Sequence, residues 1–216
     1  MIRRPAQSPE RSMQSKTPNF LGEMDKSNGY EGIAKIYING RGQALNGIGS
    51  SAVRRWAKTI PSGSVLLDLG CGTGLPISKI FVDEGMTVYG IDASPTMAKT
   101  FHQNFPDMPI ACEVVEDSLF FDRKFDAIIA WGLIFLLPEQ AQIMLIKKAA
   151  AALKSTGKLL FTSPPGAIVW TDAMTGQVSR SLGVVKYKEL IFASGLSLIK
   201  EFEDEGENHY YNAVKI

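Results

Sequence analysis

Residues 65–74 read Val-Leu-Leu-Asp-Leu-Gly-Cys-Gly-Thr-Gly, and this stretch decides the fold. Its first half has aliphatic side chains at nearly every position, which predicts a strand buried on both faces of a sheet. The glycines that follow permit positive φ and let the backbone approach a ligand closely. Residues 75–82 are apolar at helical spacing, so a helix is expected directly after the turn. The N–H groups at the N-terminus of such a helix favour a ligand bound at the turn.

The spacing of the glycines indicates which ligand is bound. A dinucleotide fingerprint reads G-x-G-x-x-G, whereas Gly74 here follows Gly70 by four positions. The strand also carries Asp68, whose carboxylate would repel a pyrophosphate and would pair with a cationic group. Residues 68–74 resemble the first motif of class I S-adenosylmethionine-dependent methyltransferases. The resemblance implies that the cofactor is S-adenosylmethionine, held by this loop at its methionine and ribose parts; a structural turn in another Rossmann-like protein is the alternative.

Composition agrees with a single globular α/β domain. The chain has 216 residues, 45% of them hydrophobic and 21% charged, and a net charge of +1. This balance gives no signal for nucleic-acid binding, and no run of 18 apolar residues predicts a membrane span. Cys71 and Cys112 are the only two cysteines, and both fall in expected core-strand regions. A reduced, cytoplasmic protein is therefore expected.

The chain divides into a leader and one domain. Residues 1–25 are rich in Pro, Ser, Gln and Arg, which predicts a disordered leader rather than a secretory signal; a transit peptide is the alternative. Residues 26–62 are expected to form N-terminal helices, and residues 63–216 the Rossmann-like core. A second helix within 26–62 is expected to begin with Ser50 or Ser51 as its N-cap.

The first of these helices is a candidate lid. Tyr30, Ala34, Tyr37 and Arg41 lie four residues apart, so they share one helix face. The resemblance implies that a helix at this place covers the cofactor, with Tyr37 and Arg41 facing the cofactor carboxylate or the substrate. A packing helix with half-buried tyrosines is the alternative.

The second expected strand, residues 86–91, ends at Asp92. An acid at this place lies beside the glycine loop and can accept hydrogen bonds from both ribose hydroxyls. Ser94 and Pro95 already supply the cap and first residue of the next helix, so Asp92 is not needed as a cap. The resemblance also implies that Met97, in that helix, packs on the adenine ring.

The next two strands contribute further candidates. Residues 110–115 predict a third strand, less apolar and nearer an edge, followed by Glu116-Asp117-Ser118. The resemblance places such a triplet at the adenine rim, although Glu116 stands where a small residue is usual; a solvated acidic turn is the alternative. Residues 125–130 predict a fourth strand that ends at Trp131, where the resemblance places the transferable methyl group. The Asn/Asp-Pro-Pro-aromatic motif, usual here in amino-methyltransferases that act on DNA bases or amide nitrogens, is absent. Metal-dependent catechol-type enzymes need acids at this place, and none is present, so no metal is expected.

The C-terminal third completes the expected sheet. A helix from Pro138 should end at a turn over 155–158, before a fifth strand over 159–162. Residues 163–185 predict an irregular loop that forms one wall of the substrate pocket, with a solvated loop as the alternative. Residues 187–194 predict a short helix. Residues 196–202 and 209–216 predict the last two strands. The resemblance implies that the first is parallel and the second antiparallel, which brings Glu207 and His209 to the rim as candidate catalytic residues; a solvated turn and a structural histidine are the alternatives.

We therefore expect a three-layer Rossmann-like sandwich whose seven-stranded, mostly parallel sheet has an antiparallel last strand. The expected activity is metal-independent methyl transfer to a small-molecule acceptor by in-line displacement. An RNA or protein methyltransferase, a non-catalytic S-adenosylmethionine-binding module and, least favoured, a nicotinamide enzyme are the alternatives. The candidate cofactor-binding residues are Asp68, Gly70, Cys71, Gly72, Gly74, Asp92, Ala93, Met97, Glu116, Asp117, Ser118, Trp131, Tyr37 and Arg41.

Overall fold

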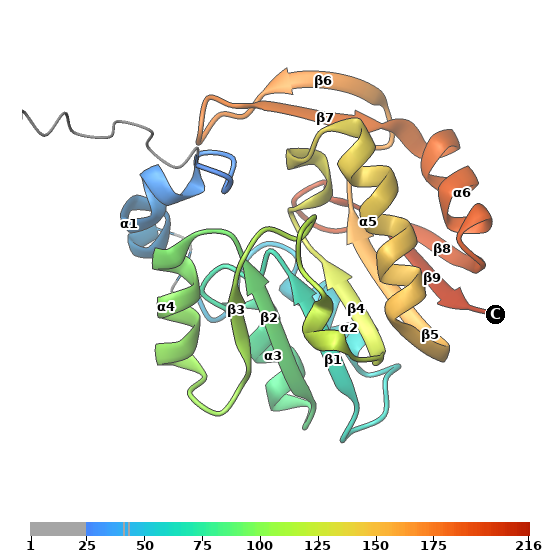
Figure 1. Ribbon diagram of the computed structural model, residues 1–216, viewed down its shortest axis with the longest axis horizontal. Coiled ribbons are helices and arrows are strands. Elements are labelled where there is room, and N and C mark those ends of the chain that lie inside the picture. Colours follow the sequence, from blue (N-terminus) through green and yellow to red (C-terminus); the bar gives the residue numbers. More distant parts are fainter. Residues whose placement is uncertain (1–24, 41, 43) are drawn as a thin grey trace, which may run out of the picture.

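The computed structural model describes residues 25–40, 42 and 44–216, so Arg41 and residues 1–24 of the expected leader lie outside the described part. The described chain forms a central sheet with helices on both faces (Figure 1). This is the expected three-layer α/β architecture.

Seven strands form the main sheet in the order β3-β2-β1-β4-β5-β9-β8. All neighbouring pairs are parallel except those that involve β9, which is antiparallel to both β5 and β8. The expected antiparallel last strand is therefore confirmed. The strands span Val65–Leu69 (β1), Thr87–Asp92 (β2), Ile110–Cys112 (β3), Phe125–Ala130 (β4), Leu153–Thr162 (β5), Leu196–Glu203 (β8) and His209–Lys215 (β9).

Helices cover both faces of the sheet, and the alternating side chains of β1 pack against both sets of helices. Leu67 and Leu69 pack in one buried cluster with α5 and α6, whereas Leu66 packs in a second cluster with α2, α3 and α4. Both faces are covered, as expected for a strand with aliphatic side chains at nearly every position. The helices span Tyr30–Gly40 (α1), Ser50–Ala57 (α2), Ile77–Asp83 (α3), Pro95–Asn104 (α4), Glu139–Ala152 (α5) and Gly183–Ala193 (α6), with 3₁₀ turns at Phe120–Asp122 (η1) and Ile134–Leu136 (η2).

The structure corrects the expected loop over residues 163–185. Ala167–Thr171 (β6) and Val178–Leu182 (β7) pair as an antiparallel hairpin separate from the main sheet, and α6 begins at Gly183. The hairpin arches over the carboxyl end of the sheet towards the N-terminal segment (Figure 1). Asp172 shapes its turn, since one carboxylate oxygen accepts from the backbone N–H groups of Met174 and Thr175.

Three smaller expectations are also wrong. β5 begins at Leu153, directly after α5, and the expected turn over 155–158 is an irregularity within the strand. β3 is only three residues long, and Cys112 at its end is exposed rather than in the core. The N-cap of α2 is Gly49 rather than a serine, in a left-handed conformation that suits glycine.

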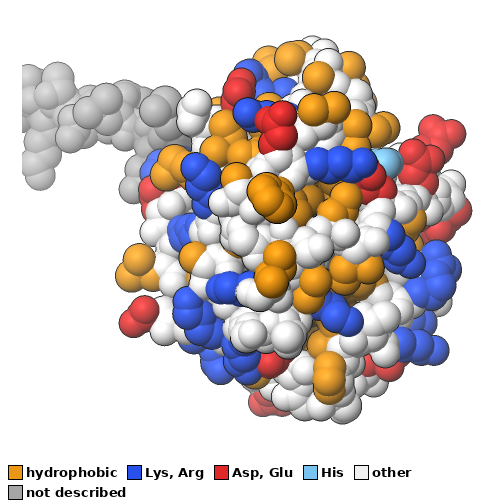
Figure 2. All heavy atoms as spheres, turned by 90° about the vertical axis from the view of Figure 1, so that its right-hand side faces the viewer, with side chains coloured by type: hydrophobic (Ala, Val, Ile, Leu, Met, Phe, Trp, Pro, Cys, Tyr) orange, Lys and Arg blue, Asp and Glu red, His pale blue; other side chains and the backbone are white. Residues whose placement is uncertain are grey.

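The face formed by α6, β8 and the hairpin is mixed in character. Figure 2 shows hydrophobic side chains scattered there between basic and acidic ones. Val185, Phe192 and Ile199 are among the exposed hydrophobic residues of these elements. Within the described residues, no helix is long and apolar enough to cross a membrane.

Candidate active site

A cavity of about 230 Å³ lies at the carboxyl end of β1, β2 and β4. Open α/β sheets bind their ligands at this edge. Among the candidates, it is lined by Asp68, Gly70, Cys71, Gly72, Asp92, Ala93, Met97, Glu116, Trp131 and Tyr37. Residues from five separate parts of the sequence therefore meet in one space.

Asp68 is buried at the floor of this cavity. Its Oδ2 accepts a 2.5 Å hydrogen bond from the Ser78 hydroxyl on α3, which fixes the carboxylate. Burial raises the pKa of Asp68 to about 7, opposed by the Ser78 hydrogen bond, while the negative charge of Asp92 raises it further. A buried carboxylate of this kind favours a cationic ligand, because the ligand would supply the missing countercharge.

Asp92 is held at the end of β2 by two backbone groups. Gly72 N–H donates to its Oδ2 and Ser94 N–H to its Oδ1, both at 2.8 Å. Burial raises the pKa of Asp92 to about 6, although these hydrogen bonds favour the charged form. The helix cap is Ser94, whose hydroxyl accepts from Met97 N–H, so the carboxylate of Asp92 is not used as the cap.

The glycines of the loop differ in what surrounds them. A Cβ at Gly70 would lie 3.1 Å from a methyl group of Leu133, and one at Gly74 would lie 2.4 Å from the ring of Phe105. Gly74 thus packs against α4 and does not line the cavity. Gly72 lines the cavity, and a Cβ added there would have no neighbour within 4 Å, so the backbone at Gly72 borders open space.

These residues fit S-adenosylmethionine. The open backbone at Gly72 and the fixed carboxylate of Asp92 border one space, where ribose hydroxyls can donate to Asp92. The buried charge of Asp68 suits a cationic group, and Met97 offers an apolar surface for a ring. Among the described residues, no group of three or more His, Cys, Asp or Glu side chains could hold a metal ion.

Helix α1 covers this part of the cavity. Its Glu31 accepts from Thr96 N–H at 3.1 Å and from the Thr96 hydroxyl at 2.7 Å, and it also accepts from the Ser94 hydroxyl. A carboxylate is favoured here because it faces the N-terminus of α4. Tyr37 of α1 lines the cavity, whereas Arg41 lies outside the described residues.

Two segments that line the cavity approach each other. Lys26 forms an exposed ion pair with Asp117 at 3.1 Å, and Lys26, Ser27 and Asn28 line the cavity. A Cβ at Gly29 would lie 3.1 Å from the Cβ of Thr175, so the N-terminal segment contacts the β6–β7 turn. Met174 of that turn also lines the cavity. The segment 163–185, expected as an irregular loop, thus reaches the cavity through Met174 at the tip of a hairpin.

The opposite end of the cavity, after β4, is apolar. Leu133, Phe135, Leu136 and Leu137 line it together with Trp131. Trp170 does not line the cavity; its ring packs on Phe135 with centroids 5.6 Å apart.

A chain of hydrogen bonds holds Trp131. Its Nε1 donates to the Tyr210 hydroxyl at 2.8 Å, and this hydroxyl donates to Asp204 Oδ2 at 2.7 Å. Burial and the hydrogen bond to Asp204 raise the pKa of Tyr210 far above its ordinary value, so it stays protonated. Asn208, from the same β8–β9 turn as Asp204, lines the cavity.

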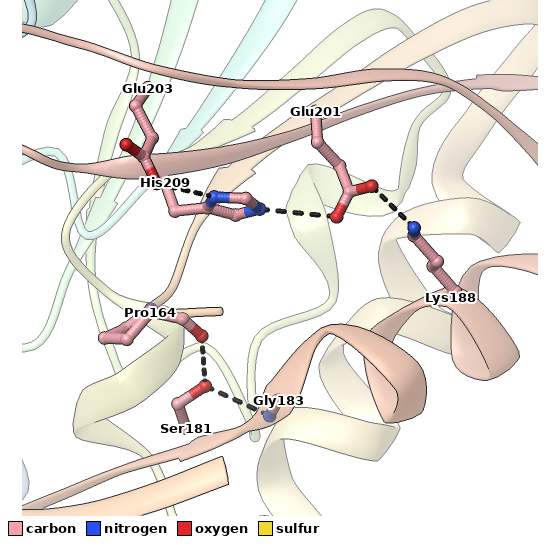
Figure 3. A network of polar contacts seen from close by, with 7 residues as sticks. All are labelled: Pro164, Ser181, Gly183, Lys188, Glu201, Glu203 and His209. Atoms are coloured by element: carbon pink, nitrogen blue, oxygen red, sulfur yellow. Dashed lines mark hydrogen bonds and ion pairs between the residues drawn. The ribbon is translucent and has the colours of Figure 1, made fainter. Parts of the chain in front are cut away.

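Four other candidates do not line the cavity. Asp117 is exposed in its ion pair with Lys26, and the Ser118 hydroxyl accepts from Phe120 N–H. Glu207 lies in the β8–β9 turn with a left-handed φ of 60°. The ring nitrogens of His209 lie 3.3 Å from Glu201 and Glu203 carboxylate oxygens, and Glu201 also pairs with Lys188 of α6 (Figure 3). His209 therefore belongs to a polar cluster that joins β9, β8 and α6.

Sequence reasoning missed several lining residues. Lys26, Ser27 and Asn28 precede α1 and carry no motif, so their place over the cavity depends on how α1 docks on α4. Met174 comes from the turn of the β6–β7 hairpin, whereas Asn208 comes from the β8–β9 turn, which was expected at the rim. The turn signal of Asp172 followed by Gly176 could have indicated the first of these hairpins.

Comparisons with known proteins agree with this geometry. A family model described as a methyltransferase domain matches residues 45–203. No curated protein sequence matches the chain.

Solved structures share the fold at low sequence identity. A magnesium protoporphyrin IX methyltransferase from Synechocystis PCC 6803 with bound SAM has 16% identity and a TM-score of 0.66, over 86% of this chain and 97% of that one. A TehB-like SAM-dependent methyltransferase from Corynebacterium glutamicum has 19% identity and a TM-score of 0.66, over 86% and 96%. The sugar N-methyltransferase KedS8 from Streptoalloteichus sp. has 19% identity and a TM-score of 0.65, over 84% and 92%.

The family model covers most of the chain, including the glycine loop, Asp92 and β4. This match confirms the resemblance noted from the first motif. The chain belongs to the methyltransferase domain family, and it is an S-adenosylmethionine-dependent methyltransferase.

Proposed function

We propose that this protein methylates a small-molecule acceptor that binds at the end of the cavity formed by β4, η2 and the β6–β7 turn. The observation that carries this proposal is the small size of the cavity together with its largely apolar lining after β4. Its volume is about 230 Å³, and residues on either side of the Gly29–Thr175 contact, Asn28 and Met174, line it. Such a space suits a metabolite better than an RNA or protein segment.

In this proposal the chain divides its cavity between two ligands. Asp68, the glycine loop, Asp92, Ala93, Met97 and Glu116 hold the cofactor, with α1 and Tyr37 as the cover. Trp131, Leu133, Phe135 and Met174 form the acceptor end. S-adenosylmethionine, when bound, supplies the electrophilic methyl group, so the protein chiefly orients the acceptor and excludes water.

The relatives support a small acceptor. Structures that share the fold include enzymes whose names specify a porphyrin and sugars. Neither Glu207 nor His209 has a part in the proposal, because neither lines the cavity. A cytoplasmic location is proposed as well, supported by the two cysteines, which are both free.

Transfer of a labelled methyl group tests the proposal. The protein is incubated with methyl-labelled S-adenosylmethionine and a metabolite extract, with RNA and protein fractions assayed in parallel. Label in the small-molecule fraction is expected. Label only in RNA or protein would overturn the small-molecule assignment, and binding of the cofactor without transfer to any fraction would indicate a binding module.

A further inference from the structure

The acceptor end of the cavity carries one polar side chain whose orientation is set by another residue. This side chain is Asn208, which lines the cavity from the β8–β9 turn. Its Nδ2 donates to both carboxylate oxygens of Asp204, at 3.1 and 2.9 Å. A carboxylate only accepts hydrogen bonds, so the amide must present its NH₂ group to Asp204 and turn Oδ1 away.

Asp204 is well suited to impose this orientation. Hydrogen bonds from Tyr210, Asn208 and Gly206 outweigh burial and lower the pKa of Asp204, so it is ionised at neutral pH. The same carboxylate holds Tyr210, which holds Trp131. Asp204 therefore positions two separate lining residues, Trp131 and Asn208.

The Oδ1 atom of Asn208 is an available acceptor. Within the described chain, no hydrogen-bond donor reaches it. An amide oxygen fixed in this way selects a ligand with an N–H or O–H group, because a ligand without one leaves it unpaired.

The distribution of charge limits the rest of the ligand. Among the described residues, four charged side chains line the cavity: Lys26, Asp68, Asp92 and Glu116. They come from the segment before α1, from β1, from β2 and from the loop after β3. The lining residues from the β4 exit, η2 and the two hairpin turns are Trp131, Gly132, Leu133, Phe135, Leu136, Leu137, Met174 and Asn208, all uncharged. A charged acceptor would be desolvated there with no oppositely charged side chain among the described lining residues of this end.

We infer that Asn208, positioned by Asp204, selects an uncharged acceptor that has an apolar body and a nucleophilic N–H or O–H group. This inference rests on the proposed function. The heteroatom lone pair forms the bond to the methyl carbon, and the methyl–sulfur bond breaks with its electron pair staying on sulfur. Asn208 accepts a hydrogen bond but cannot take the proton, which is lost to water. Amines that are neutral at working pH and weakly acidic hydroxyls meet this requirement.

The test measures acceptor binding to the protein saturated with S-adenosylhomocysteine. The probes are neutral aryl amines and phenols, each paired with a fully methylated counterpart that lacks the N–H or O–H and with a carboxylated counterpart. Dissociation constants are measured by ligand-observed NMR for wild type, Asn208→Ala and Asp204→Asn. Gln103→Ala serves as the matched control, since it also truncates an amide but lies exposed on α4 away from the cavity.

The expected result is that neutral donors bind best and lose roughly tenfold in affinity in Asn208→Ala, about the effect of one hydrogen bond. Their methylated counterparts should bind both proteins equally, and Gln103→Ala should match wild type. If Asp204→Asn does not fold, the comparison of wild type with Asn208→Ala is sufficient. Best binding by carboxylated probes, an unchanged preference in Asn208→Ala, or no binding by any probe would overturn the inference. Calorimetric binding of S-adenosylhomocysteine is measured first; its absence would overturn the proposed function itself.

Discussion

The Ser78 hydroxyl and the Asp68 carboxylate are 2.5 Å apart, and this contact joins α3 to the end of β1 beneath the cavity. It holds a carboxylate that is only 2% exposed. Burial nevertheless raises the pKa of Asp68 to about 7. Burial of this carboxylate reduces stability in the absence of ligand, and with the binding role proposed for Asp68 this leads to the first prediction.

Replacing Asp68 by asparagine should stabilise the ligand-free protein at pH 8. Because the pKa of Asp68 is raised in the folded state, the folded protein binds the proton more tightly than the unfolded chain, and stability falls as pH rises from about 4 to about 7. Asp68→Asn removes this loss, on the order of 1–4 kcal/mol. Urea unfolding at pH 5 and pH 8 measures it, with exposed Asp83→Asn as the control. A variant less stable than wild type at pH 8 but not at pH 5 would contradict this account.

Cofactor affinity should rise with pH. The cationic cofactor favours ionised Asp68, and the ribose hydroxyls favour ionised Asp92, whose pKa is raised to about 6. Between pH 8 and pH 5, we expect the dissociation constant of S-adenosylmethionine to increase roughly tenfold or more. Calorimetry across this range checks the trend. The dependence should flatten in Asp68→Asn, and an equally steep dependence in that variant would show that Asp68 is not responsible.

Glu31→Ala should loosen the cover without unfolding the core. The substitution removes the contacts with Ser94 and Thr96 that dock α1 on the first turn of α4. Faster dissociation of S-adenosylhomocysteine is expected, with affinity reduced by roughly tenfold, equivalent to ~1.4 kcal/mol. Stopped-flow measurements of dissociation test it, and Glu189→Gln on distant α6 is the control. Equal dissociation rates in both variants would mean that α1 does not retain the cofactor.

Gly49→Ala should reduce stability and methyl transfer more than Gly195→Ala does. Both glycines have positive φ, 84° and 74°, so both substitutions carry backbone strain of about 1 kcal/mol or more. A Cβ at Gly49 would also lie 2.7 Å from the Tyr210 hydroxyl and 2.9 Å from Trp131 Nε1, whereas Gly195 has open space.

Thermal unfolding and acceptor turnover distinguish these two substitutions. Gly49→Ala should show the larger loss of stability and reduced methyl transfer, with affinity for S-adenosylhomocysteine nearly unchanged. If the two variants behave alike, the crowding around Tyr210 has no functional consequence.

The sequence predicted the centre of the sheet well, because local patterns there coincide with burial on both faces. β1 and β4 have the expected bounds, and the expected cap Ser94 and edge position of β3 are confirmed. Asp68 and Asp92 reach one cavity because parallel strands end at the same edge.

Other features depend on contacts between distant residues. The β6–β7 hairpin has weak alternation, with Ala167–Val169 all exposed, so its sequence looked irregular. Trp131 lines the cavity, but the hydrogen bond to Tyr210 that holds it joins residues 79 positions apart. The β8–β9 turn was expected at the rim, but Asn208 lines the cavity while Glu207 and His209 do not, because the direction of a side chain in a turn is not encoded by local pattern.

The most direct test of the central claim is a calorimetric titration of wild type and Asp92→Ala with S-adenosylhomocysteine. Wild type should bind one molecule per chain, and Asp92→Ala should bind at least roughly tenfold more weakly, because Asp92 lines the cavity with both oxygens fixed by the backbone. Absence of binding by wild type, or equal affinity in the variant, would contradict the assignment of this cavity to the cofactor.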